Sequence, residues 1–525
     1  MLKRIRPLRL SRLEAICLAA SIIFLLVIFL PPVYVLSYAF KGGITLDAQG
    51  QTALTNSLII GLAVTLADII LGLPVAWVMA RRKNLPMRHF IDTLIDMPLV
   101  VPTSVLGLSI FYFWGGGIGS LFGLDGGLVG KGPLLIALLH VVFTFPYIVR
   151  SIEAAIQQID MTHEQAATML GASSLTAFRT ISLPLFKKGL ISGMILVFTR
   201  SLSETGATMM VAGAYLTAPT IVVAYKQASD IHSAAAVSVI LIAVAVALLL
   251  ATRAFSGALR VPIGHVWPRA ERALSRRYVG LRDAIIGAAV VASILLPTFY
   301  IVLTGANTVN LNAFASLASD SVMMDAIIVS FVVGFVVTAA NLVLAVPMAI
   351  FINKNMFKLG SLADTMGDII LLVPTSALGL SLGLFWKNFA FGEYLILILA
   401  HLSFTFPLML KPIVASLSGV DTRLEDAART LGARQSTMYR TIVYPLVRPA
   451  IIAGVIMTFM RSLSETGATL AVSDKIKTIP VVLVDAFTKG QVKDDTILAC
   501  IILFAISFAF IIVLKLTDRG ENAVR

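Results

Sequence analysis

Uninterrupted apolar runs recur along this chain, and they constrain its fold more than any other feature. A lipid bilayer offers no hydrogen-bond partners, so a chain crosses it as α-helices or as a closed β-barrel. Runs of about twenty apolar residues are long enough for such helices. The composition agrees, since 58% of the 525 residues are hydrophobic and 13% are charged, with a mean hydropathy of +0.93. The sequence therefore predicts an all-α polytopic membrane protein.

The apolar runs predict about twelve membrane helices, six in each half of the chain. The first run is too long for the apolar region of a signal peptide and has no clear cleavage site, so we expect an uncleaved helix. In chain order the predicted spans are 16–40, 58–80, 91–114, 134–149, 189–211, 233–251, 284–304, 326–352, 369–386, 395–410, 450–472 and 497–516.

The second half of the sequence repeats the order of the first. For example, VPTSVLGLS begins at Val101 and returns as VPTSALGLS at Val373. Because each half holds an even number of spans, both halves enter the membrane from the same side, and the repeat is parallel about an axis along the membrane normal. We predict two six-helix units, 1–255 and 284–525, joined by a linker at 256–283.

Basic residues gather in short segments beside the apolar spans, above all in 1–12 and in the linker 256–283. The formal net charge of +13 could suggest nucleic acid, but this placement is the positive-inside pattern of membrane proteins. We therefore expect no nucleic-acid partner, and we expect both termini and the linker on the cytoplasmic side. A piece of the linker around 270–278 is predicted to lie on the surface as an amphipathic segment.

A polar stretch of equal length occurs in both halves, and we name the copies loop 1 (160–184) and loop 2 (421–445). They read DMTHEQAATMLGASSLTAFRTISLP and DTRLEDAARTLGARQSTMYRTIVYP, without a gap. Each begins with an aspartate suited to cap a helix, reaches a glycine that would end this helix, and closes on a proline that would stop a second helix. These residues are Asp160, Gly171, Pro184, Asp421, Gly432 and Pro445. Ordinary amphipathic loops are the alternative, which the ungapped duplication disfavours.

The sequence RSLSETGAT places charges inside an apolar span of each half. Such charges are costly in a membrane and are by default functional. Arginine and glutamate four residues apart share a helix face, and the glycine that follows would let the helix break. Two interpretations stay open: a pair that only fixes packing, or a gate where the two copies face each other. The charged residues are Arg200, Glu204, Arg461 and Glu465.

The two VPTS segments are further candidates for lining a pathway, through Thr103, Ser104, Thr375 and Ser376. Proline inside a span frees backbone carbonyls, and neighbouring hydroxyls can bond backbone groups. Helix kinks and packing are an equally supported interpretation.

Histidine and cysteine give no sign of a metal or catalytic site. His140 and His401 recur shortly before FTFP in both halves, where a packing or hydrogen-bonding role is favoured over a ligand role. Cys17 and Cys500 lie in apolar spans at opposite ends of the chain, so they indicate neither a disulfide framework nor a metal cluster. We expect no metal site and no catalytic residues.

Loops 1 and 2 resemble the cytoplasmic EAA loop of ABC importer permeases: Glu-Ala-Ala, three residues, glycine, nine residues, Ile-x-Leu-Pro. The spacing from glycine to isoleucine fits in both loops. The glutamate position falls on Gln165 and Asp426, with a glutamate one residue earlier in each loop, and Tyr444 replaces the leucine. The resemblance implies that each loop is a coupling helix that docks into a groove on a separate ATPase subunit. The residues it assigns to this docking are Glu164, Gln165, Ala166, Ala167, Gly171, Glu425, Asp426, Ala427, Ala428 and Gly432.

A resemblance to binding-protein-dependent permeases covers nearly the whole chain. It implies a permease subunit of an ATP-driven importer in the cell membrane. The implied partners are two copies of a cytoplasmic ATPase, an extracytoplasmic binding protein and membrane lipid. The sequence contains no Walker motif, so ATP would be used by the partner, and we expect neither enzyme activity nor a cofactor in this chain.

The substrate class is indicated only locally. RSLSETGAT resembles the Arg-x-Leu-x-Glu-Phe-Gly-Ala motif of molybdate and sulfate permeases, with Thr205 and Thr466 in place of the phenylalanine. This resemblance implies an inorganic oxyanion such as molybdate, tungstate or sulfate, whereas fused permeases also resemble importers of iron(III) and thiamine. An ion-gradient-driven secondary transporter is the other alternative. It needs a coupling carboxylate, for which Asp68 is a candidate, although its repeat mate is Asn341.

Overall fold

The computed structural model describes residues 12–82, 87–117, 127–255, 267–354 and 359–522. Within these ranges the chain forms helices and turns and no strand, so the predicted all-α class is confirmed. Ten helices are long and apolar enough to cross a membrane, or up to twelve if each of two bent helix pairs counts as one span. The predicted number of spans is confirmed in this sense.

The two units contain matching series of helices. The first unit holds α1 (Arg12–Phe24), the π-helical turn η1 (Leu25–Phe29), α2 (Leu30–Gly42), α3 (Ala48–Arg81), α4 (Arg88–Val100), α5 (Thr103–Tyr112), α7 (Pro133–Gln157), α8 (Met161–Met169), α9 (Ser174–Ala177), η3 (Phe178–Ser182), α10 (Leu183–Ser203), α11 (Gly206–Val211), α12 (Ala218–Gln227) and α13 (Ile231–Phe255). The second holds α15 (Val279–Val290), η5 (Val291–Leu295), α16 (Leu296–Gly305), α17 (Leu311–Ser319), α18 (Ser321–Asn353), α19 (Gly360–Leu372), α20 (Thr375–Lys387), α21 (Glu393–Ser418), α22 (Thr422–Thr430), α23 (Gln435–Met438), η8 (Tyr439–Val443), α24 (Tyr444–Leu463), α25 (Gly467–Val472), α26 (Ile479–Thr488) and α27 (Asp494–Asn522).

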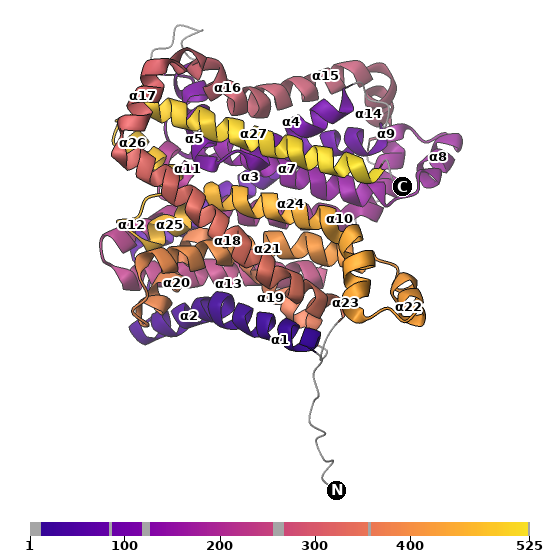
Figure 1. The fold of residues 1–525 in the computed structure, drawn as a ribbon. Coiled ribbons are helices and arrows are strands. Elements are labelled where there is room, and N and C mark those ends of the chain that lie inside the picture. The colour runs from indigo at the N-terminus through magenta and orange to yellow at the C-terminus, as the bar shows by residue number, and fades with distance from the viewer. Residues whose placement is uncertain (1–11, 83–86, 118–126, 256–266, 355–358, 523–525) are drawn as a thin grey trace.

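The first helices of each unit pack on the other unit. Helices α1 and α2 lie against α18 and α20, whereas α15 and α16 lie against α3 and α5 (Figure 1). A polar contact holds α16 on α5 of the other unit. The Ser109 hydroxyl on α5 donates to the Pro297 carbonyl at 2.6 Å and accepts the Ile301 N–H at 2.9 Å. The two units are therefore interlocked in one bundle.

The third and ninth predicted spans were each expected as one helix, and this expectation is wrong. Helices α4 and α5 meet at an angle of 104°, and α19 and α20 at 109°. Each bend falls on a Val-Pro step, where Val101 and Val373 are extended, with ψ of 132°. A residue before proline avoids the helical region, and proline has no N–H to continue the helix. The same Val-Pro dipeptide thus turns both spans.

The prolines of loops 1 and 2 do not stop a helix, contrary to the sequence prediction. Pro184 lies at the start of α10, directly after η3, and the chain stays helical from Ser174 to Ser203. The Leu183 N–H bonds the Phe178 carbonyl five residues back. Such a wide π turn leaves room for the proline ring and needs no N–H from it. Pro445 follows η8 in the same way.

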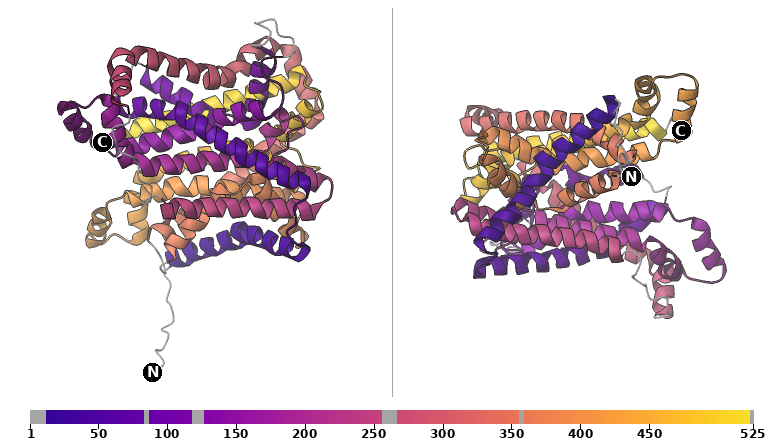
Figure 2. Two further views of the ribbon diagram at one scale, coloured as in Figure 1. Left: turned by 180° about the vertical axis from the view of Figure 1, so that it is seen from behind. Right: turned by 90° about the horizontal axis from the view of Figure 1, so that it is seen from below.

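Loops 1 and 2 protrude from one end of the bundle. Helix α8 of loop 1 and α22 of loop 2 extend beyond the membrane-length helices at the same end, opposite to α12, α17 and α26 (Figure 1). The two further views show the same arrangement, with the purple and orange loops at the same end of the bundle and apart from one another (Figure 2). The duplicated loops therefore form a pair on one surface.

The linker forms helical structure where it is described. Helix α14 (Pro268–Arg272) and the π turn η4 (Ala273–Arg277) cover the predicted amphipathic piece and pack on α9 of loop 1. Helix α15 begins at Val279, inside the predicted linker, because Arg282 and Asp283 do not interrupt it. The predicted unit boundaries themselves stay predictions.

Glycines permit the closest contacts between helices. Two glycines of α20, one at a close contact and one at an ordinary van der Waals distance from its neighbours, test this statement. A Cβ at Gly379 would lie 2.7 Å from the Ala468 carbonyl oxygen, whereas a Cβ at Gly383 would find its nearest neighbour at 3.8 Å. We expect Gly379→Ala to lower the free energy of unfolding by about 1–3 kcal/mol, because backbone cannot yield as a side chain does. Gly383→Ala is the matched control in the same helix and should be neutral or stabilising. Thermal unfolding of the purified protein measures both, and equal effects would contradict the packing argument.

Candidate functional site

Loop 1 and loop 2 adopt the predicted helix–turn geometry. Asp160 caps α8 by accepting the Thr162 N–H at 2.9 Å, which holds the pKa of its carboxyl below the usual range. Asp421 caps α22 in the same way, accepting the Arg423 N–H at 2.9 Å. The predicted glycines end these helices with left-handed φ of 91° at Gly171 and 79° at Gly432. A turn of this kind is a C-terminal cap that glycine forms without strain.

The loop helices divide the predicted docking residues between two faces. Toward the protein lie Glu164, Ala167, Glu425 and Ala428, all partly or fully buried. Toward the surface lie Gln165, Ala166, Asp426 and Ala427, together with Gly171 and Gly432. The sequence analysis overlooked the most exposed apolar groups of the loops, Met169, Leu170 and Leu431, with exposed fractions of 88%, 89% and 87%. Exposed apolar residues at a protruding tip mark an interaction surface.

Glu164 is the acidic residue of loop 1 that has a basic partner. Its carboxylate lies 2.5 Å from the Arg81 guanidinium and accepts the Ser182 hydroxyl at 2.9 Å. Among the described residues, the basic partner of Glu425 is Arg429, one helical turn later in the same loop, at 3.9 Å. The two loops therefore share a shape but not a set of contacts with their own unit.

The RSLSETGAT segments break their helices, as the glycines predicted. Helix α10 ends at Ser203, Glu204 is extended, and α11 starts at Gly206. The Glu204 carboxylate accepts the Ala207 N–H at 3.2 Å, and Glu465 accepts the Ala468 N–H at 2.9 Å. Each carboxylate thus satisfies a donor that the break exposes.

The two breaks touch each other across the axis between the units. A Cβ added at Gly206 would lie 2.5 Å from Cβ of Thr466, and one added at Gly467 would lie 2.6 Å from Oγ1 of Thr205. Any side chain larger than hydrogen at either glycine would force the segments apart. Identical residues from the two units therefore meet in a reciprocal contact.

The two arginines differ in their partners. Arg461 lies 2.7 Å from the Glu465 carboxylate, so the predicted pair is present in the second unit. In the described part of the chain Arg200 has no carboxylate within 4.0 Å, and the predicted pair with Glu204 is wrong. The Arg200 guanidinium lies instead 5.8 Å from the ring centre of Tyr147. Two segments of identical sequence thus differ in their contacts: Arg461 forms an ion pair, whereas Arg200 lies over an aromatic ring.

A small cavity of about 120 Å³ brings both arginines together. Its lining includes Arg200, Arg461, Tyr147, Phe404 and Thr375. Of the four predicted VPTS hydroxyl residues, Thr375 alone is among the described residues that line it. The others, Thr103, Ser104 and Ser376, are buried at the bends, and the Ser104 and Ser376 hydroxyls find no hydrogen-bond partner in the described ranges.

The recurring histidines hold the breaks in place. Nδ1 of His140 lies 2.8 Å from the Ser201 hydroxyl and its Nε2 lies 2.9 Å from the Thr208 hydroxyl, so one ring bridges both sides of the break. His401 makes the same two contacts with Ser462 and Thr469, at 2.9 and 3.0 Å. The predicted hydrogen-bonding role is confirmed.

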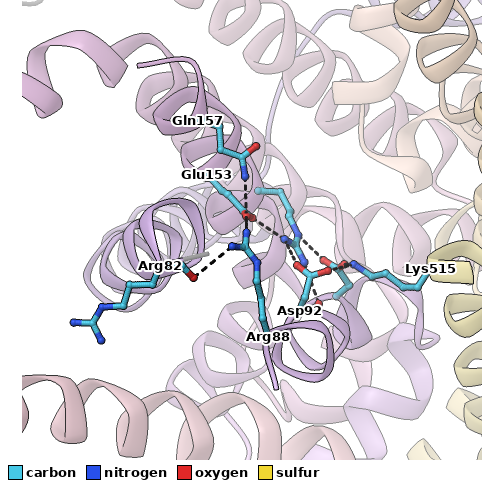
Figure 3. Close-up of polar contacts among 8 residues, drawn as sticks. Arg82, Arg88, Asp92, Glu153, Gln157 and Lys515 are labelled. Carbon is cyan, nitrogen blue, oxygen red and sulfur yellow. Dashed lines mark hydrogen bonds and ion pairs between the residues drawn. The ribbon is translucent and has the colours of Figure 1, made fainter. Parts of the chain in front are cut away.

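An ion-pair cluster that the sequence analysis missed joins the units near the loops (Figure 3). Arg150 on α7 lies 2.7 Å from both Asp92 and Asp96 on α4 and 2.6 Å from Glu153. Lys515 on α27 of the second unit reaches the same two aspartates, with 2.7 Å to Asp96. A repeated signal was present in the sequence, because two aspartates four residues apart recur in α19, where Lys411 pairs with them at 2.6 Å.

Comparison with known proteins agrees with this architecture. The family described as "Binding-protein-dependent transport system inner membrane component" matches residues 72–260 and 341–520, one match in each unit. The chain is 30% identical over 234 residues to the molybdate/tungstate transport system permease protein WtpB of Methanocaldococcus jannaschii, which is 45% of this chain and 93% of that protein.

Two further relatives carry related names. The molybdenum transport system permease protein ModB of Haemophilus influenzae is 39% identical over 164 residues, covering 30% of this chain and 70% of ModB. The sulfate transport system permease protein CysT of Salmonella typhimurium is 29% identical over 252 residues, covering 44% and 88%. Each alignment covers most of the relative but less than half of this chain, so each relative corresponds to about one unit.

The unequal pairing predicts unequal costs of neutralising the two glutamates. Glu465→Gln would leave the Arg461 charge unpaired, and we expect it to lower the free energy of unfolding by about 3 kcal/mol. Glu204→Gln removes a carboxylate that has no arginine within 4.0 Å in the described structure, so we expect a change of about 1 kcal/mol or less. Chemical unfolding of the two purified variants compares them directly. Equal destabilisation would show that the pair at Arg461 contributes nothing special.

Proposed function

The chain belongs to the binding-protein-dependent transport system inner membrane components, and on that premise we propose that it is the complete membrane pathway of an ATP-driven importer for an inorganic oxyanion. The observation that carries the proposal is the small cavity where Arg200 and Arg461 meet between two linked helix breaks. The names of the relatives support the substrate class, since they specify molybdate, tungstate and sulfate.

The paired loops support two ATPase contacts. They protrude at one end of the bundle, and their tips expose Leu170 and Leu431. We propose that each loop binds one copy of a cytoplasmic ATPase, which binds the ATP, and that this chain itself has neither a cofactor nor enzyme activity. The loop end, with both termini, is then cytoplasmic, as the basic segments beside the spans also indicate. A binding protein delivers the substrate at the opposite end.

The breaks in RSLSETGAT suit a gate. An anion in the cavity would meet two guanidinium groups, one of which Glu465 already partly neutralises at 2.7 Å. Conduction requires a site that binds weakly enough to release its ion. We infer that the glutamate limits how tightly the anion is held, and that separation of the Gly206–Thr466 contact opens the path.

The geometry at Asp68 supports an importer over an ion-gradient-driven transporter. The Thr144 hydroxyl lies 2.5 Å from Asp68 and 2.6 Å from the His140 carbonyl. In the second unit Thr405 makes the same carbonyl contact and receives the Asn341 amide N–H at 2.7 Å. A hydroxyl has one proton to donate, so the units match when Asp68 is neutral and donates like an amide. A carboxyl that makes the same hydrogen bonds as the amide at the equivalent position of the second unit fits a structural role.

Coupling is tested at the turn of loop 2. Gly432→Val has open space for its side chain but must adopt φ of 79°, which costs about 1–3 kcal/mol for a β-branched residue. We expect roughly tenfold weaker binding of the ATPase and a matching loss of substrate-stimulated ATP hydrolysis. Gly43→Val is the control, with φ of 78°, open space and a position away from both loops. Normal coupling in the loop variant would reject the docking role.

The role of the arginines is tested by neutralising and by exchanging charges. Arg461→Gln should reduce oxyanion uptake at least about tenfold while the ATPase complex stays assembled. The exchange Arg461→Glu with Glu465→Arg preserves the pair in reversed order. If the arginine meets the anion, the exchanged protein stays defective, and recovered uptake would favour a packing role.

Uptake of radiolabelled molybdate, tungstate and sulfate is compared with that of iron(III) and thiamine. Transport of either alternative in place of the oxyanions would reject the substrate class.

A further inference from the structure

Beside loop 2 the structure contains a groove that no transport step uses. It has a volume of about 620 Å³ and lies between the loop-side ends of α18 and α21 on one side and η8 and α24 on the other. Its lining is mostly aliphatic, as at Ile350, Val447 and Ile451, with two tyrosines, Tyr439 and Tyr444. Arg440 is the cationic residue of this lining.

The first unit has a corresponding groove beside loop 1, with a volume of about 370 Å³. Leu73 and Trp77 of α3 and Phe178 of η3 occupy the positions of Val346, Ile350 and Tyr439 in the repeat. This groove has additional walls from the linker and from the start of the second unit. They are Ser275, Arg282, Asp283 and Ile286.

The linker also supplies a negative charge to loop 1. Glu271 of α14 accepts from the Arg179 guanidinium at 2.7 Å and from the Thr176 hydroxyl at 2.8 Å. Arg440 is the repeat mate of Arg179, is exposed, and has no carboxylate within 4.0 Å among the residues that the structure describes. A second cation stands close by, because Nζ of Lys354 lies 5.1 Å from the ring centre of Tyr439. Arg440 and Lys354 thus supply the cations of this arrangement, and no described carboxylate lies opposite Arg440.

The chain's own N-terminal segment has the wrong charge to supply that anion. In the sequence repeat, η1 of the first unit corresponds to η5 of the second. The sequence segment 1–11 therefore corresponds to α14 and η4 of the linker. Residues 1–11 contain no aspartate or glutamate, and they carry Lys3, Arg4, Arg6 and Arg9. This segment therefore offers no carboxylate that could take at loop 2 the role that Glu271 has at loop 1.

We propose that this groove binds one acidic phospholipid, with its phosphate at Arg440 and Lys354 and an acyl chain along the aliphatic lining. Long apolar walls, an interfacial tyrosine such as Tyr444, and cations at the end of the membrane helices are the chemistry of such a lipid. The lipid then takes the place at loop 2 that Glu271 takes at loop 1. The assignment to the cytoplasmic leaflet rests on the proposed function, whereas the binding itself does not.

Lipid retention by the purified full chain tests the proposal. The protein is equilibrated in detergent with equal amounts of phosphatidylglycerol and phosphatidylcholine, and the bound lipid is counted by native mass spectrometry. We expect one preferentially retained phosphatidylglycerol. Each groove cation near an anionic headgroup contributes about a fivefold gain in affinity, so Arg440→Gln should weaken retention about fivefold and Arg440→Gln with Lys354→Gln about 25-fold.

Two further variants separate the groove from general charge. Arg423→Gln removes a cation from the same loop at a side chain that is 90% exposed and lies outside the groove, and it should leave retention unchanged. Ser436→Trp fills the groove without changing charge and should abolish retention. The repeat mate of Ser436 is Leu175, so a large apolar side chain is accommodated at this position in the first unit.

Equal retention of the two lipids by the wild-type chain, or unchanged retention in the double variant, would overturn the proposal. If Arg440→Gln spares lipid binding but weakens binding of the ATPase, Arg440 contacts the partner protein instead. Because the assay contains neither ATPase nor substrate, failure of the importer assignment would leave its result unchanged.

Discussion

The reciprocal contact between Gly206 and Thr466 and between Gly467 and Thr205 is the constraint on which the rest of the structure depends. The contact leaves no room for a side chain at either glycine. The helix breaks of the two units must therefore lie directly opposite each other. The break exposes backbone donors, which the glutamates accept, and a histidine from α7 or α21 fixes both sides of it. Polar groups inside a membrane must find their partners within the protein, and the glutamates and histidines supply partners for a backbone N–H and two hydroxyls at each break.

Fusion of the two units allows them to differ, and the differences lie around this contact and around the loops. The Arg461–Glu465 pair has no equivalent at Arg200 within the described structure. The linker supports loop 1 through Glu271, and Lys515 of the second unit joins the aspartates of α4. Two identical subunits would repeat each contact on both sides. A single chain can instead hold one side firmly and leave the other to respond to a partner or a lipid.

The sequence predicted those features that depend on local chemistry. Asp160 and Gly171 bound a loop helix as expected, because a cap and a left-handed turn are properties of a few adjacent residues. Pro184 was wrongly expected to stop a helix, because the π turn that accommodates it shifts hydrogen bonds by one residue without a composition signal. The packing of α1 and α15 on opposite units, and the unequal partners of two identical segments, depend on contacts between distant residues, which the sequence pattern does not specify.

A disulfide across the central contact tests the account most directly. In a chain without Cys17 and Cys500, the variant Thr205→Cys with Gly467→Cys places two cysteines where Cβ of Thr205 lies 3.0 Å from the added Cβ. This is close to the separation of about 3.5–4.5 Å in a disulfide. The account predicts rapid cross-linking by a mild oxidant and a further loss of transport on oxidation. Because a side chain at Gly467 itself disturbs the contact, that loss is measured against the reduced double variant and against Gly467→Cys alone. Absence of the cross-link, or transport at the normal rate by the cross-linked protein, would contradict a gate at this contact.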